Sequence, residues 1–280
     1  RLTGRIDAAV LPLPTPHGGG TDPLPLGALR GWEAAVDVTA ARVPTAGGPP
    51  LRNLKAHVGV AGGTLNINGL RANLDGGDLD GSVTMGGATV PPALAVDLTL
   101  VGAVPDPPVA IGPVTLAGGT MNAAIRVVAH GYSLAAIRAT LAGRARVVAS
   151  GGVLRGLNLP AIRAAVARDE ATGSDPVGDA PLLAALAGGA TPYATLAADA
   201  AIEAGSLTLD GARLAGPDGT IEAAGVAGLA GGGLDLRLAL RPATEDGRPG
   251  PAIGLQLTGP PDAPRRIPDL AGVLRWLSRG

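Results

Sequence analysis

The sequence has 280 residues and a formal net charge of -1, and no block of Lys or Arg stands out in it. Because proteins that bind nucleic acid usually carry a basic patch, this charge balance excludes DNA and RNA as expected partners. Apolar residues make up 46% of the chain, Phe and Cys are absent, and no apolar run approaches the roughly 18 residues of a membrane span.

Alternation of apolar and polar residues recurs along the chain and predicts β-strands, because successive side chains of a strand point to opposite faces. In the first half the alternation is clear at Leu65 and Ile67 and again over residues 94–100. Glycine pairs at residues 62–63, 76–77 and 118–119 are typical of the turns between such strands. We therefore expect consecutive antiparallel strands.

Helical signals are few and lie mainly in the middle of the chain. Ser133 precedes apolar residues at helical spacing, as an N-cap does. A second short helix is expected over residues 160–168 and a third over 181–189, where a glycine pair ends it. The polar stretches 12–25 and 169–178 show neither the helical nor the strand spacing of apolar residues. We expect both to be mobile loops.

Strands return in the second half. The clearest is LDLRLALR, residues 234–241, which places four leucines on one face and mostly charged residues on the other. An amphipathic helix capped by Asp269 follows over residues 270–279. Its Trp276, beside two arginines, suits a membrane interface, but a helix that caps the end of a sheet has the same pattern. We favour the capping interpretation.

One internal repeat is visible. The segment GTLNINGLRANLDGGDLDGSV, which starts at Gly63, is similar to GSLTLDGARLAGPDGTIEAAGV, which starts at Gly205. In each copy a second glycine, Gly69 or Gly211, follows six positions after the first. Each copy is predicted to form two strands and a turn, and stacked hairpins of this kind would extend one sheet.

The predicted fold is mainly β: a long curved antiparallel sheet with a few short helices, either an open β-groove or a flattened sandwich. An open groove is favoured because the helices are too short to cover a long sheet and the aromatic residues that would fill a closed core are missing. We expect a β-rich lead region over residues 1–131 and a β region with short helices over residues 132–280.

No catalytic, metal or cofactor site is predicted. The histidines are scattered, without a metal-ligand neighbour at helical or hairpin spacing, and are interpreted as surface residues: His17, His57 and His130. The acidic cluster at residues 75–80 lacks the closing Glu of a calcium loop, and residues 216–225 do not fit a phosphate loop. We therefore expect no enzymatic activity.

The second half resembles the AsmA family. Residues 141–159, LAGRARVVASGGVLRGLNL, follow the order of Leu and Gly in a conserved family segment, except that Asn158 stands where the family usually has Asp. Residues 191–214 and 221–241 resemble the strands of a second segment, and residues 253–264, IGLQLTGPPDAP, resemble the final strand. The resemblance covers roughly residues 132–269 well and the preceding β region more loosely.

This resemblance implies a segment of a bacterial envelope protein, on the periplasmic side, anchored to the inner membrane through a segment outside this chain. It also implies a role in outer membrane biogenesis and phospholipid transport, with phospholipid or another acyl-chain lipid held on an apolar sheet face. The expected lipid-facing residues are Leu65, Ile67, Leu207, Leu209, Leu234, Leu236, Leu238 and Leu240. The alternative is a scaffold or assembly factor that binds outer-membrane proteins through a free sheet edge.

Overall fold

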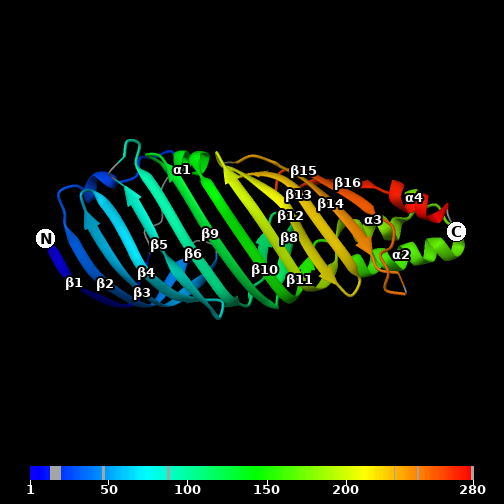
Figure 1. Ribbon diagram of the computed structural model, residues 1–280, viewed down its shortest axis with the longest axis horizontal. Coiled ribbons are helices and arrows are strands. Elements are labelled where there is room, and N and C mark those ends of the chain that lie inside the picture. The colour runs from blue at the N-terminus through cyan, green and yellow to red at the C-terminus, as the bar shows by residue number, and fades with distance from the viewer. Residues whose placement is uncertain (13–19, 46–47, 87–88, 230, 245, 279–280) are drawn as a thin grey trace. The chain divides into compact units, whose positions relative to one another are not determined.

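The computed structural model describes residues 1–12, 20–45, 48–86, 89–229, 231–244 and 246–278. Within these residues the strands form an open, mixed sheet of 16 strands, and the chain has four α-helices (Figure 1). The strands follow the order β1 to β6 and then β9 to β16, while β7 pairs with β8 and β8 pairs with β10. The mainly β prediction is confirmed, and the sheet is open and not a closed sandwich.

The chain divides into two compact units. The first comprises Arg1–Val104, Met121–Arg146 and Ala201–Leu207, and the second comprises Pro105–Thr120, Val147–Ala200 and Thr208–Gly280. The boundary expected between residues 131 and 132 falls inside the first unit.

The first unit is built mainly of strands that follow one another along the chain. Its elements are β1 (Leu2–Val10), η1 (Leu26–Leu29), β2 (Ala34–Thr45), β3 (Gly48–Ala61), β4 (Thr64–Leu74), β5 (Gly77–Gly86), β6 (Ala93–Ala103), most of β9 (Thr120–His130) and α1 (Leu134–Thr140). Adjacent strands from β2 to β9 pair antiparallel, but β1 and β2 pair parallel. The expectation of a wholly antiparallel sheet is wrong at this pair, because the long connection over residues 11–33 lets the chain return in the same direction.

The second unit carries most of the helices. It contains β7 (Val109–Ile111), β8 (Val114–Ala117), α2 (Leu159–Thr172), η2 (Pro176–Gly178), α3 (Ala180–Ala187), β13 (Gly219–Gly228), β14 (Leu234–Pro242), β15 (Ile253–Gly259), β16 (Arg265–Asp269) and α4 (Ala271–Leu277). Three further strands have residues in both units: β10 (Ala142–Arg155), β11 (Ala190–Glu203) and β12 (Ser206–Gly216). Helix α2 packs on α3 and β14, α3 on β16 and α4 on β15.

Helices α1 and α2 begin at side chains that cap them. The Ser133 hydroxyl accepts a hydrogen bond from the Ala136 N–H at 3.2 Å, as expected. Asn158, the residue that departs from the family pattern, caps α2 by accepting from the Ala161 N–H at 3.1 Å. Helix α2 continues to Thr172, so the predicted loop at 169–178 is wrong over its first four residues. Asp169, within this extension, is buried with Leu159, Ile162 and Val166 of the same helix.

The terminal helix covers sheet. Val273 on α4 is fully buried, and the Asp269 carboxylate accepts a hydrogen bond from the Ala271 N–H at 3.0 Å. These contacts favour the capping interpretation of α4. Of the other predicted loop, residues 13–19, which include His17, lie outside the described residues.

The internal repeat is confirmed as two strands and a turn. Strands β4 and β12 have 11 residues each, and the strands that follow them, β5 and β13, have 10 each. Gly69 and Gly211 occupy the same position in their strands, and both have positive φ, +58° and +86°. Gly69 lies at a shift in the register between β4 and β5, where an extra residue is accommodated. The two copies are therefore alike in local structure.

Candidate functional site

Side chains on one face of the first unit form continuous aliphatic rows across the strands. In the central row, Ile67 on β4 lies opposite Val58 on β3 and Val83 on β5. The members of this row, in strand order, are Val36, Val58, Ile67, Val83, Val96 and Val127. A neighbouring row holds Ala34, Val60, Leu65, Met85, Leu94 and Ala129. We call this surface the aliphatic face.

The opposite face of the same strands is polar. Cross-strand pairs join His57 to Asp37 at 3.0 Å and Arg126 to Asp97 at 2.7 Å. The Thr84 hydroxyl donates to the Asn66 side chain at 3.1 Å. These pairs are exposed or only partly buried, so each adds little to stability. They do fix which face is turned to water, and the other face is left for apolar contacts.

The helical segments of the first unit lie at one end of its strands (Figure 1). The Leu24 N–H donates to the Tyr132 carbonyl oxygen at 2.6 Å, just ahead of α1. A Cβ placed on Gly86, at the end of β5, would lie 3.6 Å from the Leu29 Cδ1 of η1. Among the described residues, α1 and η1 therefore close an end of the aliphatic face and do not cross its middle. The central row is half-buried from Val36 to Val96.

In the second unit helices cover part of the apolar sheet face. Leu255 on β15 lies opposite Leu238 on β14 and is 2% exposed. Side chains from the sheet and from the helices packed on it are buried completely: Leu240, Ile253, Ile162, Leu182 and Val273. This part of the chain has a conventional core, built from the small aliphatic residues that the composition predicted.

The residues predicted to face lipid fall into two groups. Six are half-buried: Leu65, Ile67, Leu207, Leu209, Leu236 and Leu238. The other two, Leu234 and Leu240, are 5% and 0% exposed, so the rest of the chain already covers them. The structure brings Leu65 and Ile67 together with partners that the prediction did not name, chiefly Val83 and Met85. Alternation marks each of these strands separately, but only the strand register aligns them in rows.

The AsmA family model matches residues 20–210, more than half of the chain. The chain belongs to the AsmA family. Its match contains β2 to β11, and so includes most of the aliphatic face, as well as the segment 141–159, one of those that carry the resemblance. The segments 221–241 and 253–264, which also carry it, lie beyond the matched residues. No curated protein and no solved structure matches the chain. The AsmA family is associated with the cell envelope.

Two further properties of this AsmA-family chain concern membranes and metals. None of its described helices has the length and hydropathy needed to cross a membrane. Within the described part of the chain, no three His, Cys, Asp or Glu side chains gather as metal ligands would. His57 is paired with Asp37, and His130 is an exposed residue on β9.

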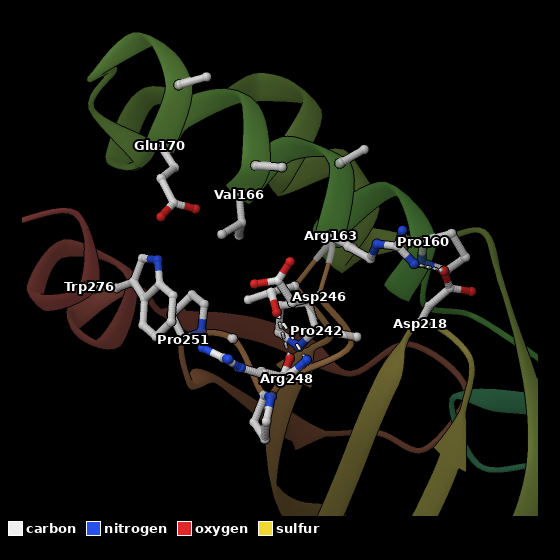
Figure 2. Close-up of a pocket in the computed structure, with 17 residues that line it drawn as sticks. Pro160, Arg163, Val166, Glu170, Asp218, Pro242, Asp246, Arg248, Pro251 and Trp276 are labelled. Atoms are coloured by element: carbon white, nitrogen blue, oxygen red, sulfur yellow. Dashed lines mark hydrogen bonds and ion pairs between the residues drawn. The ribbon is translucent and has the colours of Figure 1, made fainter. Parts of the chain in front are cut away.

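A cleft of about 830 Å³ lies in the second unit of this AsmA-family chain, between α2 and the connection from β14 to β15 (Figure 2). Trp276 of α4 forms part of its wall, and Arg163 on α2 pairs with Asp218 at 3.1 Å. The rest of the lining is mainly Ala and Pro, with both signs of charge. Asp218 belongs to the turn at residues 217–218, between β12 and β13, and residues 219–225 form the start of β13.

Two polar side chains are buried in the second unit with an oxygen that has no hydrogen-bond partner among the described residues: Asp169 Oδ2 and Tyr193 Oη. Desolvation raises the pKa of Asp169, and the charge of Asp179 raises it further. Arg168 opposes this shift, with its Nη2 3.9 Å from Asp169 Oδ1. Burial also raises the pKa of Tyr193. Both residues belong to the helix-covered second unit, whereas the aliphatic face belongs to the first.

Proposed function

We propose that this chain is a non-enzymatic, periplasmic module of an AsmA-family envelope protein that holds the acyl chains of phospholipid on its aliphatic face. In this role it contributes to outer membrane biogenesis and to phospholipid transport or homeostasis. The parent protein is anchored to the inner membrane by a segment outside this chain.

The aliphatic face is the observation that carries this proposal. Its central row crosses six strands with Val and Ile alone, and the neighbouring row adds only Ala, Val, Leu and Met. The side chains of these rows carry no strong hydrogen-bond donor or acceptor, so the surface suits a hydrocarbon chain better than a polar substrate. Removing apolar area from water stabilises contact by about 25 cal/mol per Å².

The contrast between the two units supports the same function. In the second unit the chain supplies helices that cover part of the apolar sheet face, at β14, β15 and β16, whereas in the first unit α1 and η1 stay at an end of the strands. A half-buried aliphatic surface of several strands is larger than the scattered apolar residues of an ordinary surface. An acyl chain would complete the burial that the first unit leaves unfinished.

Neighbouring residues on β6 provide a matched test. Val96 points to the aliphatic face between Val83 and Val127, while the adjacent Ala95 points to the polar face. The wild-type chain, Val96→Glu and Ala95→Glu would each be expressed in a bacterial periplasm and purified in mild detergent. Native mass spectrometry and lipid extraction then measure the bound phospholipid. Circular dichroism checks that both variants keep the strand content of the wild type.

We expect phospholipid with the wild type and with Ala95→Glu, and a large loss with Val96→Glu, because a buried carboxylate is costly beside acyl chains. Equal lipid in all three folded proteins would show that the lipid lies elsewhere. A wild-type chain without lipid would contradict the proposal itself.

A further inference from the structure

The cleft in the second unit has the volume and the walls of a small-molecule site. Its volume of about 830 Å³ lies within the range of roughly 300 to 1,000 Å³ that is usual for ligand pockets. Val166, Pro242 and Pro251 are buried in its wall, and Trp276 is half-buried. The cleft therefore offers apolar surface and one aromatic ring to a molecule that enters it.

One charged pair in the cleft is already satisfied. Arg163, in the first half of α2, donates to Asp218 Oδ1 at 3.1 Å. Glu170 lies about two helical turns further along the same helix, a rise of roughly 10 Å. In Figure 2 it points toward the end of the cleft at which Trp276 stands. The groups that are free to bind a ligand are therefore expected beyond Arg163, toward Trp276.

Three charged side chains line that part of the cleft. Glu170 points into it from α2, and Asp246 points into it from the connection between β14 and β15, which also carries Arg248 (Figure 2). Among the described residues, none of these three side chains forms an ion pair or a hydrogen bond. The Thr244 hydroxyl holds the Arg248 backbone in place, because it accepts from the N–H and donates to the carbonyl oxygen, both at 3.1 Å. Two carboxylates and one guanidinium are thus available to a ligand.

These groups together favour a ligand that carries both signs of charge. An ammonium group binds against the face of an aromatic ring, and Trp is the best of the aromatic residues for this contact. A guanidinium binds phosphate oxygens through strong, charge-assisted hydrogen bonds. An amine without an anionic group would leave its cation facing Arg248, and an anion without an amine would face Glu170 and Asp246. A zwitterion avoids both conflicts.

We propose that the cleft binds a small zwitterion with an ammonium group and a phosphate group, as in phosphoethanolamine. Trp276 and the carboxylates of Glu170 and Asp246 hold the ammonium group, and Arg248 holds the phosphate. The same chemistry occurs in the headgroup of a phospholipid and in the free zwitterion. The site lies within the second unit, so it goes beyond the acyl-chain function of the aliphatic face and does not depend on it.

The exposure of the charged side chains determines the expected affinity. Glu170, Asp246 and Arg248 are all exposed. Ion pairs between exposed groups gain little in water and weaken as salt is added. The free zwitterion should therefore bind weakly, and more weakly at high salt. Trp276 is half-buried, so its contact with the ammonium group should contribute more than any single charge does.

Calorimetric titration of the chain tests the ligand chemistry. At low salt the wild type should bind phosphoethanolamine more tightly than ethanolamine or glycerol phosphate, each of which lacks one of the two charged groups. Ethanolamine that binds as tightly as phosphoethanolamine would show that the phosphate has no role. Glycerol phosphate that binds as tightly would show the same for the ammonium group. Either result, or a wild type that does not bind phosphoethanolamine, would overturn the proposal.

Variants of the lining residues test their separate roles. Glu170→Gln should weaken phosphoethanolamine binding by about two- to five-fold and leave glycerol phosphate binding no weaker, whereas Arg248→Gln should weaken both. Trp276→Leu keeps an apolar side chain without the ring and should weaken phosphoethanolamine binding by about two- to thirty-fold.

The matched control is Arg275→Gln, because Arg275 is exposed and is not among the residues that line the cleft. Its affinity for phosphoethanolamine should equal that of the wild type. An equal loss in Arg275→Gln and Arg248→Gln would contradict a specific role for Arg248. Circular dichroism checks that every variant keeps the secondary structure of the wild type.

A flotation assay identifies the source of the zwitterion. Vesicles of phosphatidylglycerol alone are compared with vesicles that also contain phosphatidylethanolamine. Stronger binding to the second kind, lost in Glu170→Gln and Arg248→Gln but kept in Arg275→Gln, would identify a phospholipid headgroup. Binding of free phosphoethanolamine without this preference among vesicles would identify a soluble ligand. Val96→Glu on the aliphatic face should still bind free phosphoethanolamine, so a failure of the acyl-chain proposal is distinguishable from a failure of this one.

Discussion

The guanidinium of Arg266 on β16 is bonded to the backbone oxygen of Gly156, which follows β10. Its Nη1 donates to that oxygen at 2.8 Å and to the Leu186 carbonyl oxygen, at the end of α3, at 2.9 Å. One side chain thus ties the last strand to two segments far away in the sequence. Desolvation by burial lowers the pKa of this guanidinium.

Replacing Arg266 by Met should therefore lower the free energy of unfolding by about 1 to 3 kcal/mol, since two charge-assisted hydrogen bonds are lost and two carbonyl groups are left without a donor. Urea denaturation followed by circular dichroism measures the change. The adjacent Arg265 is exposed, and Arg265→Met is the control. If Arg265→Met lowered the free energy of unfolding as much as Arg266→Met does, the two hydrogen bonds of Arg266 would contribute nothing specific to stability.

Asp169 predicts a specific pH dependence. Its pKa is raised in the folded state, so the folded chain binds this proton more tightly than the unfolded chain does. The contribution of Asp169 to stability therefore improves as pH falls through its folded pKa and is unfavourable at neutral pH, where the buried carboxyl must ionise. Asp169→Asn removes the charge and should raise the free energy of unfolding at neutral pH by about 1 kcal/mol.

The advantage of Asp169→Asn over the wild type should shrink as pH is lowered. Urea denaturation at a series of pH values measures this difference. Glu170→Gln changes an exposed neighbour and should show no such trend. An Asp169→Asn variant less stable than the wild type at neutral pH would show that the charge is needed.

Gly152 on β10 and Tyr193 on β11 leave no space for a methyl group between them. A Cβ on Gly152 would lie 2.5 Å from Tyr193 Oη and 3.0 Å from the Gly118 carbonyl oxygen. Gly152→Ala should lower the free energy of unfolding by about 1 to 3 kcal/mol, the usual cost of overpacking. Thermal unfolding of the variant tests this.

The Tyr193 hydroxyl has no hydrogen-bond partner among the described residues, so Tyr193→Phe alone should leave stability unchanged or raise it. Combining it with Gly152→Ala should recover part of the lost stability, because the closest clashing atom is removed. Strictly additive effects in this double-mutant cycle would contradict direct contact.

The internal repeat makes a prediction about two equivalent glycines. Gly69 and Gly211 have positive φ, and a Cβ on either would meet no atom within 4 Å. Alanine at each position therefore introduces only backbone strain. It should lower the free energy of unfolding by about 1 kcal/mol, and by a similar amount at both positions. Asn tolerates this conformation better and should cost less than Ala. Chemical denaturation of the four single variants checks both the equivalence and the ranking.

Much of the local structure could be predicted from the sequence, because it depends on short-range rules. Alternation placed Leu65 and Ile67 on one face of a strand, Ser133 marked the start of α1, and the glycine pattern marked the repeat. The AsmA family was identified from the same ordered Gly and Leu positions. The sequence did not predict the end of α2, since a run of polar residues hid the burial of Asp169.

The sequence alone thus determined that the chain is mainly β and that its strands have an aliphatic side and a polar side. The tertiary structure decided which part of the aliphatic side stays uncovered. Leu234 and Leu240 show the same alternation as Leu65 and Ile67, yet they are buried, while Leu65 and Ile67 are only half-buried. Alternation is a property of a single strand. Whether its apolar side chains are buried depends on other segments, here helices α2, α3 and α4, which pack on β14, β16 and β15 respectively.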